Sequence, residues 1–202
     1  MHVQRPFLLL AAVAACVAAP PILAQTSESF TFLKAIRDGD AAKVEEIVNN
    51  PSSIAINARD SSGDTALHIV TRRRDLTWLS YLLTRRARPD VPGADGATPL
   101  GLAAQIGWVE GAEQLILRGA TVDMPNGRGE TPLILAVQAR QVPMVELLVA
   151  KGADVNRQDS FAGYSALDYA RRDTRNPEIL RALESPRRQP QQRPAVVGPN
   201  PD

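Results

Sequence analysis

A short motif recurs along this chain at a nearly constant interval. Its copies are Thr65-Ala66-Leu67, Thr98-Pro99-Leu100, Thr131-Pro132-Leu133 and Ser165-Ala166-Leu167, at spacings of 33, 33 and 34 residues. Two residues before each copy stands a glycine, at positions 63, 96, 129 and 163. A glycine repeated at one phase indicates a tight turn that other residues adopt at a cost. Repetition at this period is typical of a solenoid, in which each unit buries its apolar side only against neighbouring copies.

Residues 129–156 show what one unit contains, and they predict a helical hairpin. Thr131 can cap the first helix through its hydroxyl, and Pro132 then falls at the first helical position, where a missing N–H costs nothing. Pro143 opens the second helix, and Gly152 ends it in a conformation with positive φ. Both helices have an apolar side, which consists of Leu133, Leu135, Ala136, Met144, Val145, Leu147, Leu148 and Val149.

A period of 33 residues, with a β-turn, two helices and the motif T-P-L-H-x-A, resembles the ankyrin repeat, although no single copy carries the whole motif. The resemblance covers residues 30–185. It implies an all-α ankyrin-repeat solenoid of about five helix-turn-helix repeats joined by β-turn loops. We expect the repeats at residues 30–57, 58–90, 91–123, 124–156 and 157–184.

Two of these repeats depart from the pattern. The first has a polar side that suits a terminal cap exposed to water. In the second, Arg72-Arg73-Arg74 lies where a turn with glycine is usual, and Arg86 stands at the phase of Gly119 and Gly152. We therefore expect Arg86 to occupy a left-handed backbone site, at a cost of about 1 kcal/mol.

The N-terminus, residues 1–24, predicts an export signal. A weakly basic start with Arg5 precedes an apolar run that is too short to span a bilayer, and cleavage would follow Ala24. The alternative is a lipoprotein, because Val13-Ala14-Ala15-Cys16 resembles a lipobox and would leave an acylated Cys16. We expect the protein in the periplasm, with secretion or lipid anchoring as the alternatives. The C-terminal residues 186–202 are rich in Pro and Gln and are predicted to be disordered.

Charge and composition exclude several functions. Cleavage would remove Arg5 and leave 22 basic and 22 acidic residues, which gives no electrostatic case for binding nucleic acid or an anionic membrane. We expect a monomer with no membrane span after the signal is removed.

The sequence also gives no sign of catalysis. After cleavage His68 is the only histidine and no cysteine remains, so one chain cannot form a His/Cys metal set or a Cys–His pair. His68 falls at the histidine of the T-P-L-H motif, where a structural hydrogen bond is expected. Ser165 resembles part of a nucleophile elbow but is in phase with the capping threonines. We therefore expect no enzymatic activity, no cofactor and no metal.

The resemblance to ankyrin proteins implies a protein-interaction module that binds a partner on its concave surface. The alternative is an accessory or lipid-anchored envelope protein that supports an exported enzyme. Carried over by phase, the partner-binding residues are Arg59, Asp64, Asp95, Arg128, Glu130 and Tyr164 in the loops, and Arg72, Arg73, Gln105, Ile106, Gln138 and Arg172 on the first helices. We further expect Arg72 and Arg73 to meet an acidic protein surface. Arg72→Glu combined with Arg73→Glu should then weaken capture of the partner and leave the melting temperature nearly fixed.

Overall fold

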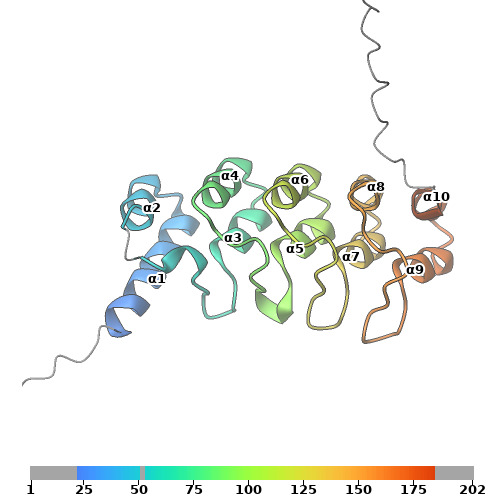
Figure 1. The fold of residues 1–202 in the computed structure, drawn as a ribbon, viewed down its shortest axis with the longest axis horizontal. Helices are drawn as coiled ribbons and strands as arrows, with labels where there is room; N and C mark the ends of the chain where they lie inside the picture. Colours follow the sequence, from blue (N-terminus) through green and yellow to red (C-terminus); the bar gives the residue numbers. More distant parts are fainter. Residues whose placement is uncertain (1–21, 51–52, 185–202) are drawn as a thin grey trace, which may run out of the picture.

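The computed structural model describes residues 22–50 and 53–184, and these form a row of five helix pairs (Figure 1). The pairs are α1 (Ile22–Asp38) with α2 (Ala41–Val48), α3 (Ala66–Arg72) with α4 (Leu76–Thr84), α5 (Pro99–Ile106) with α6 (Val109–Leu117), α7 (Pro132–Gln138) with α8 (Val142–Ala150), and α9 (Ala166–Arg172) with α10 (Pro177–Glu184). Short 3-10 turns η1 (Ala55–Asn57) and η2 (Ala94–Gly96) lie between pairs. Each predicted repeat corresponds to one helix pair, although α1 begins before the first repeat, and the predicted all-α solenoid is confirmed.

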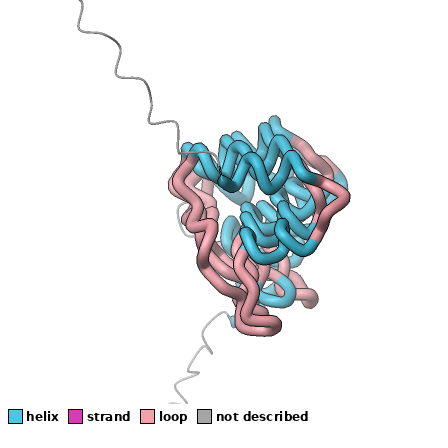
Figure 2. Tube along the Cα trace, turned by 90° about the vertical axis from the view of Figure 1, so that its right-hand side faces the viewer, coloured by secondary structure: helices cyan, strands magenta, loops and turns pink. Residues whose placement is uncertain are grey.

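The helices form two layers. The odd-numbered helices, called inner helices below, lie in one row, and the even-numbered outer helices lie in a second row beside it (Figure 1). The loops before the inner helices all project to the same side, as the end-on view shows (Figure 2). We call residues 58–65, 91–98, 124–131 and 158–165 the finger loops. Within the described ranges no strand forms, and only isolated β-bridges join Arg59 to Thr65 and Gln158 to Ser165.

The inner helices begin where the repeated motif predicts. The hydroxyl of Thr98 accepts a hydrogen bond from the Gly101 N–H at 3.1 Å, and Thr131 does the same for Ile134 at 3.3 Å. Ser165 forms a capping box with Asp168, whose carboxylate accepts from the Ser165 N–H at 3.0 Å. Each cap satisfies N–H groups that a helix leaves unpaired in its first turn.

Residues with left-handed backbone lie in the finger loops before the inner helices and at the end of outer helix α4. Gly63, Gly96, Gly129 and Gly163 have φ between 69° and 91° in the finger loops, as their repeated phase predicts. Arg86 also has a positive φ, 68°, so the predicted left-handed arginine is confirmed.

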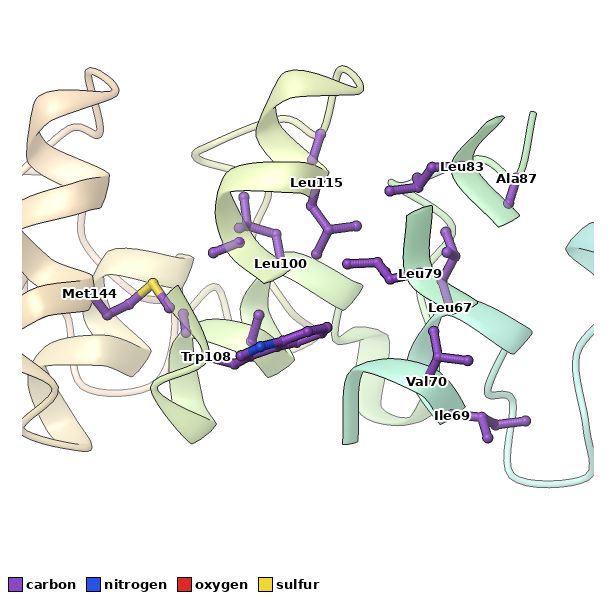
Figure 3. Close-up of a cluster of buried hydrophobic side chains, with 14 of the residues drawn as sticks. Leu67, Ile69, Val70, Leu79, Leu83, Ala87, Leu100, Trp108, Leu115 and Met144 are labelled. Atoms are coloured by element: carbon purple, nitrogen blue, oxygen red, sulfur yellow. The ribbon is translucent and has the colours of Figure 1, made fainter. Parts of the chain in front are cut away.

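Leucines between neighbouring hairpins form the core. Leu100 and Leu133, at the same phase of repeats three and four, are both 0% exposed. In Figure 3, Leu79 of repeat two points toward Leu100 and Leu115 of repeat three, so the apolar sides of adjacent repeats meet. The repeats therefore bury their apolar surface against one another, as a solenoid requires.

The predictions made for the two ends of the chain fall mostly on residues outside the described ranges. Helix α1 begins at Ile22, before the expected start of the repeats at residue 30, and it includes Ala24 and Gln25 on either side of the predicted cleavage site. Residues 1–21 of the predicted export signal, with Cys16, and the tail from residue 185 lie outside the described ranges. Among the helices described, none combines the length and apolar character needed to cross a membrane.

Candidate functional site

A groove of about 600 Å³ runs over the inner helices and finger loops of repeats two to four. Four predicted partner-binding residues, Arg72, Asp95, Gln105 and Arg128, lie along it. The rest of its lining consists of small and apolar residues with one amide: Ala94, Ala97, Gly101, Leu102, Asn126, Gly127 and Leu135. The groove thus combines an apolar floor with a polar rim, which is typical of protein-binding surfaces.

At one end of the groove, Arg72 forms an ion pair with Asp64 of the same repeat. The Asp64 side chain is 5% exposed, whereas that of Arg72 is 50% exposed. Burial alone would raise the pKa of Asp64, but hydrogen bonds from Arg72 and from the Ala94 N–H outweigh it and hold this pKa below its ordinary value. Asp64 is therefore ionised, and it holds the guanidinium of Arg72 at the rim.

His68 lies behind this pair and is almost fully buried. Its Nε2 donates to the carbonyl oxygen of Ala97 at 2.9 Å, and its Nδ1 accepts from the Thr65 N–H at 3.2 Å. Both ring nitrogens are engaged, so the imidazole is neutral and joins repeats two and three, as the motif predicts. Burial lowers the pKa of His68, and the hydrogen bond to Ala97 offsets only part of this shift.

At the other end of the groove, Glu130 holds Arg128. The Glu130 side chain is 7% exposed and its Oε2 lies 2.9 Å from Arg128 Nη2. Asn126 donates to the same oxygen at 2.7 Å, and Gln138 donates to Oε1 at 3.3 Å. A nearly buried carboxylate with several donors is ordered, and it fixes the side chains around it.

Beyond this end a second hollow, of about 400 Å³, lies between repeats four and five. The predicted residues Gln138 and Arg172 line it, together with Val137, Tyr169, Asp173, Thr174 and Arg175. Arg172 donates to the hydroxyl of Tyr164 at 2.8 Å and lies over its ring, 4.6 Å from the centroid. Tyr164 therefore orients Arg172 through both a hydrogen bond and a cation–π contact.

These contacts follow one rule of spacing. The residue after the finger glycine binds the residue eight positions later, near the end of the inner helix: Asp64 with Arg72, Glu130 with Gln138, and Tyr164 with Arg172. Repeat three departs from this rule, because Ala97 cannot form the corresponding contact with Gln105. Within the described ranges the Gln105 side chain makes no hydrogen bond, and it is exposed.

The finger loops are tied to one another. The N–H of Gly127 donates to the carbonyl of Asp95 at 2.8 Å, and the N–H of Ser160 donates to that of Arg128 at 2.9 Å. A Cβ at Gly127 would lie 2.8 Å from the Asp95 oxygen, so glycine allows this close approach. The groove wall is therefore held by backbone contacts between repeats.

Several predicted residues lie elsewhere or are covered. Asp64 and Glu130 are 3% and 6% exposed, so they position arginines and offer little surface themselves. Ile106 is half-buried against the core. Arg59 is exposed in the second repeat's finger loop.

Arg72 and Arg73, which the sequence analysis expects to meet an acidic surface, both have partners within this fold. Arg72 is paired with Asp64, and Arg73 donates to the carbonyl oxygen of Ile36 at 2.8 Å, at the end of α1. Because Arg73 joins two repeats, replacing it with glutamate is expected to lower the melting temperature, contrary to the prediction from sequence.

The floor of the groove escaped sequence analysis. Ala97, Leu102 and Leu135 carry no motif that marks a binding site, and Asn126 and Gly127 resemble ordinary turn residues. The available signal was the phase comparison that pairs Ala97 with Asp64 and Glu130. Across the described residues, no group of three His, Cys, Asp or Glu side chains could hold a metal ion.

Comparison with known protein families identifies the family of these repeats. The family described as ankyrin repeats (3 copies) matches residues 71–159 and 102–191. The chain belongs to the ankyrin repeat family. The matches begin inside the second ankyrin repeat, so the first repeat, predicted to be an atypical cap, lies outside them. A comparison with curated proteins gives no match. Ankyrin repeats generally act as protein–protein interaction modules and are typically not enzymes.

Proposed function

We propose that this protein is a non-enzymatic interaction module that binds a partner protein in the groove over repeats two to four. The observation that carries the proposal is the groove itself, because it spans three repeats and combines the apolar floor of Leu102 and Leu135 with a polar rim. The ordered ion pairs of Arg72 and Arg128 hold that rim in place. A surface that is already ordered loses less entropy when a partner binds.

The partner-binding residues proposed are those that line the two hollows: Arg72, Asp95, Gln105, Arg128, Gln138 and Arg172. Tyr164 belongs with them because it orients Arg172. Asp64 and Glu130 contribute through the arginines that they hold.

The proposal includes a location in the bacterial cell envelope. Its support is the apolar N-terminal run, the predicted cleavage site after Ala24, and the lack of any cysteine besides Cys16. Mass spectrometry of the isolated protein decides between its forms. A chain that starts at Gln25 supports a soluble exported protein, an acylated Cys16 supports a lipoprotein, and an intact Met1 contradicts export.

Affinity capture from the producing cell tests the interaction. The bait is the wild-type protein, compared with Leu102→Glu in the groove and Leu117→Glu on outer helix α6, where the side chain is 68% exposed. The same substitution thus introduces the same charge on two surfaces. We expect wild type and Leu117→Glu to capture the same partner and Leu102→Glu, if its thermal unfolding remains cooperative, to lose it. Equal capture by all three proteins would contradict binding in the groove.

A further inference from the structure

Repeat three opens the groove because two of its residues are small. Ala97 replaces the carboxylate or phenol found at this phase in repeats two, four and five. Gly101 stands at the phase of His68, Ile134 and Asp168. Both Ala97 and Gly101 line the groove. Beside Gly101 the side chain of Leu135 lies 3.4 Å from where a Cβ would stand, so the opening comes chiefly from the short side chain of Ala97.

The charges around this opening are unequal. The guanidinium groups of Arg72 and Arg128 are balanced by the nearly buried carboxylates of Asp64 and Glu130. Asp95 also lines the groove and is exposed, but no cation of the described chain forms an ion pair with it. One carboxylate of the wall is therefore uncompensated.

Asp95 is also held in an unusual conformation. Its φ is 54°, in the left-handed region, and its carbonyl oxygen accepts the hydrogen bond from Gly127 in the next finger loop. Asp tolerates left-handed backbone better than most non-glycine residues, and the contact between loops helps to hold it there. The backbone that carries this carboxylate is thus held at the groove while the charge remains unpaired.

The remaining lining fits a long basic side chain. Leu102, which is half-buried, offers apolar surface for an aliphatic stem, and the largely buried Leu135 lies behind it in the lining. The Gln105 amide, which has no partner within the described residues, adds a second acceptor through its oxygen.

We propose that the opening in repeat three binds a lysine or arginine side chain of the partner protein, with Asp95 as its ionic acceptor. This inference rests on the proposed function, since it names the chemistry of the partner that binds the same groove. It replaces the acidic partner expected from the arginines alone, because those arginines are already paired.

Two variants address the proposal without removing the fold. Ala97→Glu reproduces, beside Gln105, the Glu130–Gln138 contact found one repeat later, and so fills the opening with a pair that this fold already contains. Asp95→Asn removes the charge while keeping a side chain that tolerates left-handed backbone. Glu113→Gln, at an exposed position on outer helix α6, is the matched control for loss of one negative charge.

The probe is a displayed library of random 12-residue peptides, selected on the wild-type protein. Fluorescence anisotropy then measures the affinity of each selected peptide for the wild type and the three variants. We expect a shared Lys or Arg in the peptides, no binding to Ala97→Glu, and unchanged binding to Glu113→Gln. Asp95→Asn should weaken binding about fivefold, as loss of a moderately exposed ion pair does. Alanine in place of the shared basic residue should remove this difference between Asp95→Asn and wild type.

The outcomes separate the two claims. Two results would overturn the basic partner but leave the groove as the binding site. In both, the peptides fail to bind Ala97→Glu. They either share no basic residue or bind Asp95→Asn as tightly as they bind the wild type. Selection that yields only peptides indifferent to Ala97→Glu, or no peptide at all, overturns both the inference and the proposed function.

Discussion

The guanidinium of Arg140 binds the carboxylate of Asp173 in the next repeat, with 2.7 Å between Nε and Oδ2, although Arg140 has a left-handed φ of 57°. Arg74, at the corresponding position of repeat two, has a φ of 53° and donates to the carbonyl oxygen of Ile106 in repeat three. Each of these arginines therefore links two repeats from a backbone position that usually selects glycine.

Arg86 has the same kind of backbone, but its side chain makes no hydrogen bond or ion pair within the described residues. Arg86→Gly should therefore raise the free energy of unfolding, by about 0.5–1 kcal/mol, because the gain from relieved strain exceeds the entropy gained by the unfolded chain. Arg140→Gly should gain less or lose stability, since it also removes the ion pair. Urea denaturation of both variants checks this, and an Arg86→Gly protein less stable than wild type would refute it.

Leu133 is fully buried between repeats three and five. Leu133→Ala should lower the free energy of unfolding by about 2–5 kcal/mol, because it leaves a cavity that the neighbouring repeats cannot close. Glu146→Ala, on the exposed side of α8, is the control and should change stability little. Similar denaturation midpoints for the two variants would show that the assigned core position is wrong.

Stability should depend on the protonation of His68. Its pKa in the folded protein is lowered from the ordinary 6.5, chiefly by burial, so the unfolded chain binds a proton more readily. The stabilising contribution is complete above about pH 6.5 and is lost as the pH falls from there toward the lowered pKa. Urea denaturation between pH 7.5 and 5 should show this loss.

A His68→Gln variant provides the control for this pH dependence, because an amide does not titrate. Its free energy of unfolding should change less over the same pH range. The carboxylates of Asp64 and Asp159, whose folded pKa values lie below 3.8 despite burial, lose their stabilising contribution only below about pH 4. A wild-type stability that stays constant from pH 7.5 to 5 would contradict the role given to His68.

Arg73 should contribute to stability through repeat one. Its Nη1 donates to the carbonyl oxygens of Ile36 and Arg37, near the end of α1, where a cation also meets the negative end of the helix dipole. Arg73→Glu should destabilise the protein by about 1–2 kcal/mol. Arg157→Glu, at an exposed loop position, is the charge-matched control, and equal melting temperatures for both variants would rule out this contact.

The fold followed from local signals that recur. Thr98, Thr131 and Ser165 all cap helices in the structure. Each repeat packs against neighbours of the same kind, so the same motif forms the same local structure in each of them. The binding surface followed only in part. Phase placed Arg72 and Arg128 at the rim, but the sequence does not show that Asp64 and Glu130 already neutralise them, since those contacts depend on which side chains are buried. The sequence did not mark Ala97, because a short side chain leaves an opening only where the side chains of other segments leave room around it.

The central claim is that partners bind the groove that opens at repeat three. NMR of the ¹⁵N-labelled protein with the captured partner, or with a selected peptide, locates the contact directly. The account predicts that amide shifts change most at Asp95, Gly101, Gln105, Gly127 and Arg128, and little on the outer helices α4, α6 and α8. Changes concentrated on those outer helices, with the groove amides unaffected, would contradict it.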